Sequence, residues 1–483
     1  MMTGKEAARL AYTEKRFADA GRLARDWLQA HPEDAEGWRL LGLALAAGGE
    51  FGPAIQSYGK ALQLRPDFFE VRFNRGNALR SAGDQEGALA DYDAALALRP
   101  QHAASWNNRG IVLLDQNKPA EALQSFERAL ESQPDHVGAL NNRGNALQQL
   151  QRYLEAVTSY DRALALQPDH PDCAAHRAFL ELLAGDLPQG WERFEARRWR
   201  DSWKSSAPQF PGPELGSLEA ARGKRVLVYC EQGLGDTIQF CRYAQLLADS
   251  AAEVFLLTQP RLPRLLRGLK NVRVLGDNDL LSATCEFHIP LLSLPRLFRT
   301  DVDSIPAAVP YLNAEPDRAE RFRERIGQSG FRIGIAWQGN PAYPLDRQRS
   351  FGLRALAPLA EVPGIRLISL QKQEGVSQLD HLPPGLNVET LGEDFDSGPH
   401  AFLDTAAAMQ SCDLVLSSDT SIAHLAGALA RPVWIALTAV PDWRWRLGSD
   451  QSAWYPTARL FRQSQPGDWH GVFERIATEL KSR

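Results

Sequence analysis

The feature that most constrains the fold of this chain is a 34-residue period, which fills the first third of its 483 residues. A sequence period of 20–50 residues predicts a solenoid, in which each repeat buries its apolar face against its neighbours. Glycine and alanine let two helices approach closely, an aromatic ring fills the gap to the next repeat, and proline ends the second helix. The repeating positions are Pro32, Pro66, Pro100, Pro134 and Pro168; Gly42, Gly76, Gly110 and Gly144; Ala20, Ala54, Ala88, Ala122 and Ala156; Tyr58, Tyr92, Phe126 and Tyr160; and Ala61, Ala95, Ala129 and Ala163.

This pattern resembles the tetratricopeptide repeat, and Trp38 and Trp106 stand at that family's usual early position. The resemblance implies an α-solenoid over residues 1–204, with about five repeats and a capping repeat that closes the stack. The full copies are 35–68, 69–102, 103–136 and 137–170, with a degenerate copy at 1–34 and a partial copy at 171–200 that contains Gly190, Trp191 and Phe194.

Asparagine recurs at the sixth position of three successive repeats, as Asn74, Asn108 and Asn142. This position is on the first helix, which lines the concave groove of such a solenoid. An amide offers two donors and an acceptor, so a row of amides can bind the backbone of an extended peptide. The row is similar to the asparagine ladder of the O-GlcNAc transferases and predicts a peptide-binding groove; alternatively, these residues are repeat fillers or local caps. The next residues, which would add positive charge if they face the groove, are Arg75, Arg109 and Arg143.

Composition bears on the partners and the location of the chain. The 54 lysines and arginines against 59 aspartates and glutamates give a net charge of −5, so no global field attracts nucleic acid or an anionic membrane. No apolar run is long enough for a membrane span or a secretory signal. Five cysteines without a C-x-x-C pair favour the reducing cytoplasm. We expect His102, His136 and His170, which share one repeat position, to be solvated turn residues rather than metal ligands.

The periodicity stops near residue 205, and a segment rich in Ser, Pro and Gly predicts a linker over 205–222. Short β-branched runs then alternate with helical patterns, which predicts doubly wound parallel sheets. Two such series predict two Rossmann-like lobes, 223–312 on the acceptor side and 330–483 on the donor side, the second ending in a helix. Because ligands bind these sheets at the carboxyl ends of the strands, we expect a site in the cleft between the lobes.

A glycine turn, Gly233 and Gly235, places Asp236 at the start of the first helix of these lobes. A dinucleotide fingerprint needs a third glycine where the chain has Ile238, and a phosphate loop of the G-x-x-x-x-G-K type is absent. The carboxylate of Asp236 is therefore either a helix cap or a general base, and the residues alone leave both readings open.

Two segments, GLGDTIQFCRY from residue 233 and SSDTSIAHLAGALARPVWIAL from residue 417, resemble heptosyltransferase-type glycosyltransferases of the GT-B fold, family 9 and its relatives. The resemblance covers about residues 222–480, and its most specific part is the Asp-Thr-x-x-x-His block. Joined to the repeats, it looks like bacterial repeat-plus-glycosyltransferase proteins, some of which are linked to protein or flagellin glycosylation. It implies a nucleotide-sugar-dependent, inverting enzyme that works without a metal.

The same resemblance implies roles for single residues. Asp236 would deprotonate the acceptor hydroxyl, and Asp419, Thr420 and Ser421 would hold the donor phosphates at a helix start, with His424 one turn further. The family usually has glycine in place of Ser421. Taken alone, Asp419 could instead be a helix cap and His424 a buried, hydrogen-bonded histidine. Arg347 and Arg349 would neutralise the departing phosphate. The other donor-side residues are Gln338, Gly339, Asn340, Gln371 and Lys372. The acceptor-side loop is Gln232, Gly233, Gly235 and Gln239.

Neither a metal nor a cofactor is expected beyond the nucleotide-sugar co-substrate. The D-x-D matches stand in polar, turn-like contexts where aspartate is common. An aromatic cluster near the C-terminus either stacks on a base or sugar or packs in the core. The D-x-D pairs are Asp277/Asp279, Asp301/Asp303 and Asp394/Asp396, and the cluster is Trp443, Trp445, Trp454 and Tyr455.

The leading hypothesis is a cytoplasmic glycosyltransferase that moves a sugar from a nucleotide sugar to a hydroxyl of a protein or peptide held by the repeat groove. One alternative is transfer to a glycolipid or lipopolysaccharide precursor, with the repeats as a docking platform. Another is a non-catalytic peptide-binding scaffold. The sequence selects neither the donor nor the acceptor.

Overall fold

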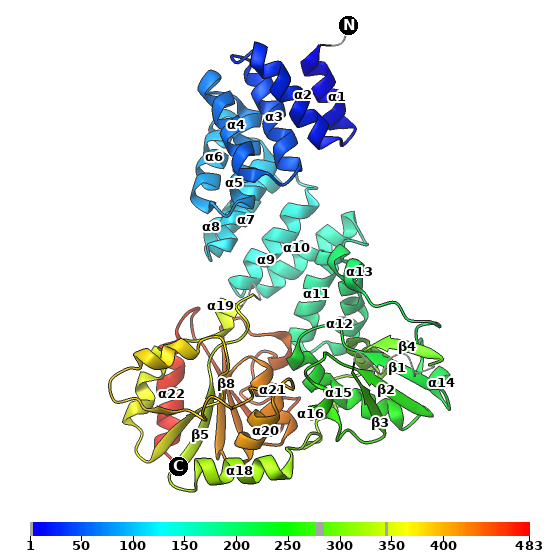
Figure 1. Cartoon of the computed structure of the whole chain (residues 1–483), viewed down its shortest axis with the longest axis vertical. Helices are drawn as coiled ribbons and strands as arrows, with labels where there is room; N and C mark the ends of the chain where they lie inside the picture. The colour runs from blue at the N-terminus through cyan, green and yellow to red at the C-terminus, as the bar shows by residue number, and fades with distance from the viewer. Residues whose placement is uncertain (1–2, 277–284, 343–345) are drawn as a thin grey trace. The chain divides into compact units, whose positions relative to one another are not determined.

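A computed structural model describes residues 3–276, 285–342 and 346–483 of the chain (Figure 1). The chain divides into two compact units, Met1–His176 and Arg177–Arg483. This division falls inside helix α11 (Pro171–Ala184), earlier than residue 204, where the sequence places the end of the repeats. Residues 177–204 therefore belong to the unit that contains the sheets.

Ten helices form the described repeats of the first unit and pack in successive pairs (Figure 1). Within each of the four full repeats the periodic glycine lies against the periodic aromatic ring: a Cβ on Gly42 would stand 2.5 Å from Cε1 of Tyr58, and one on Gly110 would stand 2.5 Å from Cε1 of Phe126. The ring thus fills the space between two helices of its own repeat, rather than the gap to the next repeat that the sequence predicts. The helices are α1 (Gly4–Thr13), α2 (Phe17–Ala30), α3 (Ala35–Ala47), α4 (Phe51–Leu64), α5 (Phe69–Ser81), α6 (Gln85–Leu98), α7 (Ala103–Asp115), α8 (Pro119–Ser132), α9 (Val137–Gln149) and α10 (Tyr153–Leu166).

Side chains at the start of the repeats stabilise the turns between them. Trp106 donates its Nε1–H to the carbonyl oxygen of Pro100 at 2.8 Å, and Trp38 does the same to Pro32. His102 and His136 cap α7 and α9, because Nδ1 of each accepts a backbone N–H of the first helical turn at 3.1 Å. These histidines are helix caps and not only solvated turn residues.

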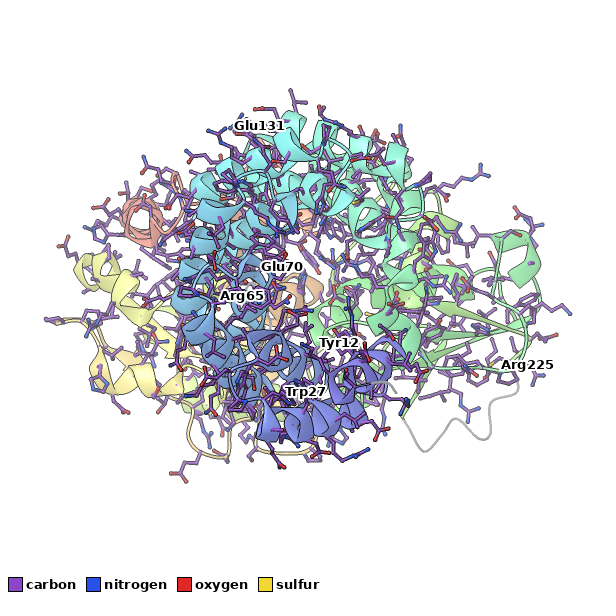
Figure 2. The ribbon with its side chains drawn as sticks, turned by 90° about the horizontal axis from the view of Figure 1, so that it is seen from above. Tyr12, Trp27, Arg65, Glu70, Glu131 and Arg225 are labelled. Carbon is purple, nitrogen blue, oxygen red and sulfur yellow. The ribbon has the colours of Figure 1, made fainter. Side chains whose placement is uncertain are left out.

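The N-terminal pair α1 and α2 is closed by larger side chains. Tyr12 of α1 and Trp27 of α2 are half-buried against the core of the first repeats (Figure 2). Trp27 also donates its Nε1–H to Asp34 at 2.8 Å, which joins this pair to the turn before α3. The degenerate copy at 1–34 therefore packs as a repeat.

Two sheets form the core of the second unit, and all their paired strands are parallel. The strand orders are β3-β2-β1-β4 and β10-β9-β8-β5-β6-β7. In each sheet the chain moves outward from its first strand and then returns to that strand's other side, which creates a switch point between β1 and β4 and between β5 and β8. The strands are β1 (Arg225–Tyr229), β2 (Glu253–Leu257), β3 (Val272–Leu275), β4 (Phe287–Pro290), β5 (Phe331–Ala336), β6 (Ile365–Ser369), β7 (Val388–Glu389), β8 (Leu414–Ser418), β9 (Val433–Leu437) and β10 (Ala458–Arg462).

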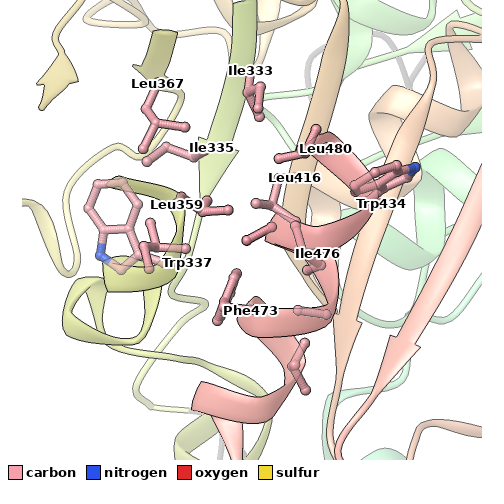
Figure 3. Packing of buried hydrophobic residues seen from close by; sticks show 14 of the residues in the cluster. Ile333, Ile335, Trp337, Leu359, Leu367, Leu416, Trp434, Phe473, Ile476 and Leu480 are labelled. Carbon is pink, nitrogen blue, oxygen red and sulfur yellow. The ribbon is translucent and has the colours of Figure 1, made fainter. Parts of the chain in front are cut away.

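A large apolar cluster covers one face of the second sheet (Figure 3). Alternate residues of β5, Ile333 and Ile335, share this cluster with Phe473 and Ile476 of the C-terminal helix α22. Every residue of β8 and β9 is buried, as expected for central parallel strands covered on both faces. The helices of this unit are α12 (Leu187–Phe194), α13 (Asp201–Ser206), α14 (Leu218–Ala221), α15 (Leu234–Ala248), α16 (Pro263–Leu266), α17 (Leu294–Leu297), α18 (Pro316–Ile326), α19 (Asp346–Arg349), α20 (Leu403–Gln410), α21 (Ser421–Ala428) and α22 (Trp469–Lys481), with 3₁₀ helices η1 (Glu195–Trp199), η3 (Leu291–Ser293), η4 (Leu353–Glu361), η5 (Val376–His381) and η6 (Trp443–Trp445).

The predicted linker, residues 205–222, is part of the second unit. Leu215 is fully buried and donates its N–H to the carbonyl oxygen of His288 at 2.9 Å, so this segment runs along the edge of β4. Leu353–Glu361 forms the 3₁₀ helix η4, which contains Pro358, a residue without an N–H. Within the three described ranges, no helix combines the length and apolarity needed to cross a membrane.

Candidate functional site

The predicted site residues follow strands that flank the two switch points. Asp236 comes after β1, Gly339 after β5, and Asp419 after β8. Parallel strands end at one edge of their sheet, so residues that follow neighbouring strands lie close together. The structure brings Asp236 and Asp419 into one charged cluster.

The centre of this cluster is Arg444 in η6, which the sequence did not single out. Its Nε donates to Oε1 of Gln239 at 2.6 Å, its Nη1 donates to Oδ1 of Asp442 at 2.9 Å, and its Nη2 donates to Oδ1 of Asp236. The guanidinium is buried, yet the carboxylates of Asp442, Asp236 and Asp419 raise its pKa against that burial. Arg444 thus joins α15, which follows the first sheet's β1, to the loop after β9.

Asp236 has both the capping contact and the exposure of a candidate base. The N–H of Gly233 donates to its Oδ2 at 2.9 Å, and Arg444 donates to its Oδ1. Burial raises the pKa of the Asp236 carboxyl, and the attraction of Arg444 offsets this only in part. Each carboxylate oxygen retains a second lone pair. Because 22% of the side chain is exposed, another hydroxyl group can reach those lone pairs.

Asp419 is not the cap of α21, because Thr420 occupies the cap position. The Asp419 carboxyl lies in the field of Asp442, Arg349 and Arg444 instead. Burial, with a further contribution from Asp442, raises the pKa of Asp419 to about 7. Near neutral pH the group is therefore divided between its protonated and charged forms.

His424 is buried in the middle of α21. Its Nδ1 is 3.0 Å from the hydroxyl oxygen of Tyr455, and its ring stacks on Trp445 with 5.4 Å between centroids. Burial and the positive charges of Arg444, Arg242 and Arg349 lower the pKa of His424 well below its usual value, so the ring is neutral. Nδ1 is thus the ring nitrogen that contacts Tyr455.

The C-terminal aromatic residues Trp443, Trp454 and Tyr455, together with Trp445, are buried. Trp443 and Trp454 pack near Phe240 of α15 at centroid distances of 6.3 and 5.5 Å. These rings are core residues, so the reading in which they stack on an exposed base or sugar is not supported by their position.

The loop after β5 is held close to Asp346. A Cβ on Gly339 would stand 2.2 Å from Oδ1 of Asp346 and 2.9 Å from Nη2 of Arg349. Arg349 also donates to Asp346 at 3.2 Å, and its charge acts on Asp419. Arg347 is exposed and makes no hydrogen bond or ion pair with any residue that the structure describes. The structure therefore brings Arg349, but not Arg347, to the charged cluster.

The remaining donor-side residues differ in how many of their polar side-chain atoms are already hydrogen-bonded within the chain. Gln371 is satisfied internally, since its Oε1 accepts the N–H groups of Trp337 and Gln338 and its Nε2 donates to the carbonyl oxygen of Gln338. The side chain of Asn340 accepts the N–H of Ala342 at 2.9 Å in a local turn. Lys372 makes only a long contact, 3.4 Å, from Nζ to the carbonyl oxygen of Glu393.

On the acceptor side, the loop before α15 is partly exposed and partly fixed. Gln232 and Gly233 are exposed, and the carbonyl oxygen of Gln232 accepts Nε2 of Gln259 at 2.7 Å. Gly235 faces α21: a Cβ there would stand 3.1 Å from Cδ2 of His424. Gln239, by contrast, is fully buried beneath Arg444 and cannot be a loop contact.

Two cavities of the second unit are lined by other residues. One of about 620 Å³ lies at Arg323, Arg332 and Gln410, and one of about 190 Å³ lies at Arg264 and His400. Neither of these two cavities is lined by a predicted site residue.

In two of the D-x-D pairs, a carboxylate accepts backbone N–H groups of nearby residues. Asp301 accepts the N–H groups of Asp303 and Ser304, and Asp396 accepts those of Asp404 and Thr405 at the start of α20. Asp277 and Asp279 lie outside the described residues. Across the described ranges, no group of three or more His, Cys, Asp or Glu side chains is arranged to hold a metal ion.

In the repeats, the asparagines bind one another across neighbouring helices. Nδ2 of Asn108 donates to Oδ1 of Asn77 at 2.8 Å, and Nδ2 of Asn142 donates to Oδ1 of Asn107 at 2.9 Å. Each of these amides retains one N–H for a further partner. The side chain of Asn74 makes no hydrogen bond with any described residue. The row is thus an inter-repeat ladder with spare hydrogen-bonding capacity.

The arginines that follow the asparagines are neutralised within the repeats. Arg75 forms two bonds with the buried carboxylate of Asp91, at 2.6 and 2.7 Å. Arg109 pairs with Asp93 at 2.7 Å, and Arg143 donates to Ser159 and lies 3.6 Å from Glu127. They therefore add little free positive charge to the ladder.

Comparison with known families identifies the repeats. The family described as "Tetratricopeptide repeat" matches residues 107–171, and "TPR repeat" matches residues 42–79 and 76–117. The prediction of tetratricopeptide repeats is confirmed, and the first unit has the architecture of a protein-interaction scaffold.

The chain is also similar to individual proteins. It is 26% identical over 335 residues to "Protein FlbA" of Caulobacter vibrioides, which covers 63% of this chain and 54% of that protein. The chain thus spans about half the length of this curated relative. Among solved structures, pilF of Pseudomonas aeruginosa is 19% identical, with a TM-score of 0.38 over 42% of this chain and 94% of that one. YrrB, described as a TPR protein with an unusual peptide-binding site, is 20% identical, with a TM-score of 0.32 over 35% of this chain and 88% of that one.

Proposed function

We propose that the chain is a glycosyltransferase that moves a sugar from a nucleotide sugar to a hydroxyl of a protein bound by the repeats. The observation that carries the proposal is the cluster at Arg444, where a carboxylate that follows β1 of one sheet and a carboxylate that follows β8 of the other lie in the field of one guanidinium. A two-lobed transferase requires this meeting of an acceptor side and a donor side.

Asp236 is the base in this proposal. The acceptor oxygen attacks the anomeric carbon, the bond from that carbon to the nucleotide phosphate breaks, and the hydroxyl proton passes to the Asp236 carboxylate. A direct displacement of this kind inverts the anomeric centre. Burial, which raises the pKa of Asp236, makes its carboxylate a stronger base than an exposed one. Its bonds to Gly233 and Arg444 hold it in place before the acceptor arrives.

The donor phosphates lie near the start of α21 in this proposal. The side chain of Thr420 makes no capping bond to the first N–H groups of that helix, and N–H groups at a helix start favour anions. Arg349, which acts on Asp419, supplies positive charge for the phosphate that departs. Asp419 is suited to a sugar hydroxyl, because a carboxyl with a pKa of about 7 can donate or accept a hydrogen bond.

The repeats supply the acceptor in this proposal. The spare N–H groups of Asn108 and Asn142 can pair with an extended backbone, and a neutral ladder suits a polypeptide better than a polyanion. The GT-B arrangement of the two sheets, the absence of a metal requirement and a cytoplasmic setting belong to the same proposal.

The test is transfer by the purified full chain. It is incubated with a cell extract and, in separate reactions, with a uridine-diphosphate hexosamine, an adenosine-diphosphate heptose and a cytidine-monophosphate nonulosonic acid. Intact masses of the extract proteins are then measured. One donor should add sugar-sized increments to a protein. Increments on lipid alone would favour the glycolipid acceptor, and no increment together with no calorimetric binding of any donor would favour a non-catalytic scaffold.

A further inference from the structure

The segment that follows the repeats, residues 187–203, contacts the loop between β1 and α15, which leads to Asp236. This segment comprises α12, η1 and the start of α13 and belongs to the second unit. It is outside both predicted lobes, and neither the repeats nor the charged cluster explains its contacts.

Glu231 is the point of contact in the loop. Its side chain is only 2% exposed, although it lies five residues before Asp236. Arg197 donates from Nη2 to Glu231 Oε1 at 2.6 Å, and Trp203 donates from Nε1 to Glu231 Oε2 at 3.1 Å. Both carboxylate oxygens are therefore held by the segment that follows the repeats.

Arg197 is itself fixed on two further sides. Nη1 donates to Glu195 at 2.7 Å, and Nη2 also donates to Ser293 Oγ at 2.9 Å, at the end of η3. Burial would lower the pKa of Arg197, but Glu231 and Glu195 raise it, so the guanidinium stays charged. Because Arg197 cannot relocate without breaking these bonds, it is a rigid anchor for Glu231.

Trp191, in the same segment, packs against α15 and against the 3₁₀ helix η6, the two elements that the charged cluster joins. Trp191 of α12 is buried and donates its Nε1–H to the carbonyl oxygen of Thr300 at 3.1 Å. Its ring stands edge-on to Phe240 of α15, at 6.2 Å, and to Trp443, at 5.2 Å. Phe240 follows Gln239, and Trp443 precedes Arg444, so Trp191 packs beside two residues that are bonded to each other in the cluster.

We propose that Arg197 is a positioning residue of the transfer site and that residues 187–203 hold the loop before Asp236 in its working geometry. Arg197 acts through Glu231, and Trp191 braces α15 against the loop of Arg444. The segment that directly follows the repeats is therefore a part of the transfer site. The role in transfer rests on the proposed function, whereas the placement of the loop does not.

The first test measures amide hydrogen exchange in the full chain, in peptides that cover residues 230–237. Losing a hydrogen bond between charged groups frees the loop, so Arg197→Met should speed exchange there about tenfold or more. Arg197→Lys, which keeps the charge, should restore part of the protection. The matched control is Arg193→Met, which removes the pair of Arg193 with the buried carboxylate of Glu181 but no contact to the loop.

Exchange in the loop that is within twofold of the wild type, or equal in Arg197→Met and Arg193→Met, would overturn the proposal. A uniform rise that includes peptides over β8 would also overturn it, because Arg197 would then support the whole fold rather than the loop. The second test is transfer itself: kcat should fall about tenfold or more with an unchanged KM for the nucleotide sugar. If wild-type chain transfers no sugar, the proposed function fails while the exchange result still decides the positioning role.

Discussion

Replacing Asp419 with asparagine should stabilise the second unit at alkaline pH and have no such effect in acid. The carboxyl lies among Asp442, Arg349 and Arg444 with little access to water, and its pKa rises from 3.8 to about 7 on folding. The folded state therefore disfavours the charged form. Asparagine has nearly the same shape as aspartate but carries no charge.

The magnitude follows from the two pKa values of Asp419. A raised folded-state pKa contributes stability that is present in full below about pH 4 and is lost as the pH rises through about 7. A difference of about three units corresponds to about 4 kcal/mol, at 1.36 kcal/mol for each unit. Asp419→Asn should thus be more stable than the wild type by up to about 4 kcal/mol at pH 8.5, with the difference closing towards pH 4.

Scanning calorimetry of both proteins from pH 4.5 to 8.5 measures this difference in the transition of the second unit. The matched control is Asp413→Asn, just before β8. Hydrogen bonds from Arg332 lower the pKa of Asp413, so its contribution is present at neutral pH and is lost as the pH falls through the lowered folded value. Asp413→Asn should therefore be less stable than the wild type at pH 7. A pH-independent difference for Asp419→Asn, or destabilisation at pH 8.5, would refute the burial of a charge at this position.

Two further predictions test the repeats and the donor side. Gly42→Ala should lower the free energy of unfolding of the first unit by about 1–3 kcal/mol, because the added methyl group overpacks against Tyr58. Gly59→Ala, whose Cβ would meet only Arg75 Nη1 at 4.0 Å, should instead raise it by up to about 1 kcal/mol through helix propensity. Urea unfolding monitored by circular dichroism distinguishes the two variants, and equal effects would contradict the close packing. Arg349→Met should weaken binding of the nucleotide that the donor releases about tenfold or more, since a charge-assisted contact is lost, whereas Arg347→Met should change it less than twofold. Calorimetric titration measures both, and a larger effect of Arg347→Met would contradict the placement of Arg349 at the site.

The repeats could be predicted from the sequence because their contacts are local and recur. The pairing of Gly42 with Tyr58 stays within one repeat and is copied every 34 residues, so the period itself records it. What the period does not record is the partner of each polar side chain. Asn108 binds Asn77 of the preceding repeat, a contact between stacked repeats, whereas His102 caps its own helix through a local contact to Ser105.

Only those residues of the candidate site that directly follow a strand could be predicted from the sequence. Asp236, Gly339 and Asp419 follow strands, and parallel sheets gather such residues at one edge. Arg444 was missed because its partners Asp236 and Gln239 lie more than 200 residues away. A basic residue between two tryptophans in an otherwise buried segment is the signal that could have indicated it. The sequence ends the repeats at residue 204, whereas the compact units divide at His176 and Arg177. Trp191 stands in the predicted partial repeat, but its indole N–H bonds to Thr300 of the second unit.

The most direct measurement of the central claim is the intact mass of an acceptor protein after reaction with the wild-type chain and with Asp236→Asn. The wild type should add sugar-sized increments. Asp236→Asn should add none while it still binds the donor, because asparagine cannot take the proton; Asp249→Asn, an exposed residue after the far end of the same helix, should transfer as the wild type does. Equal increments with wild type and Asp236→Asn, or none from the wild type with any donor, would contradict the account.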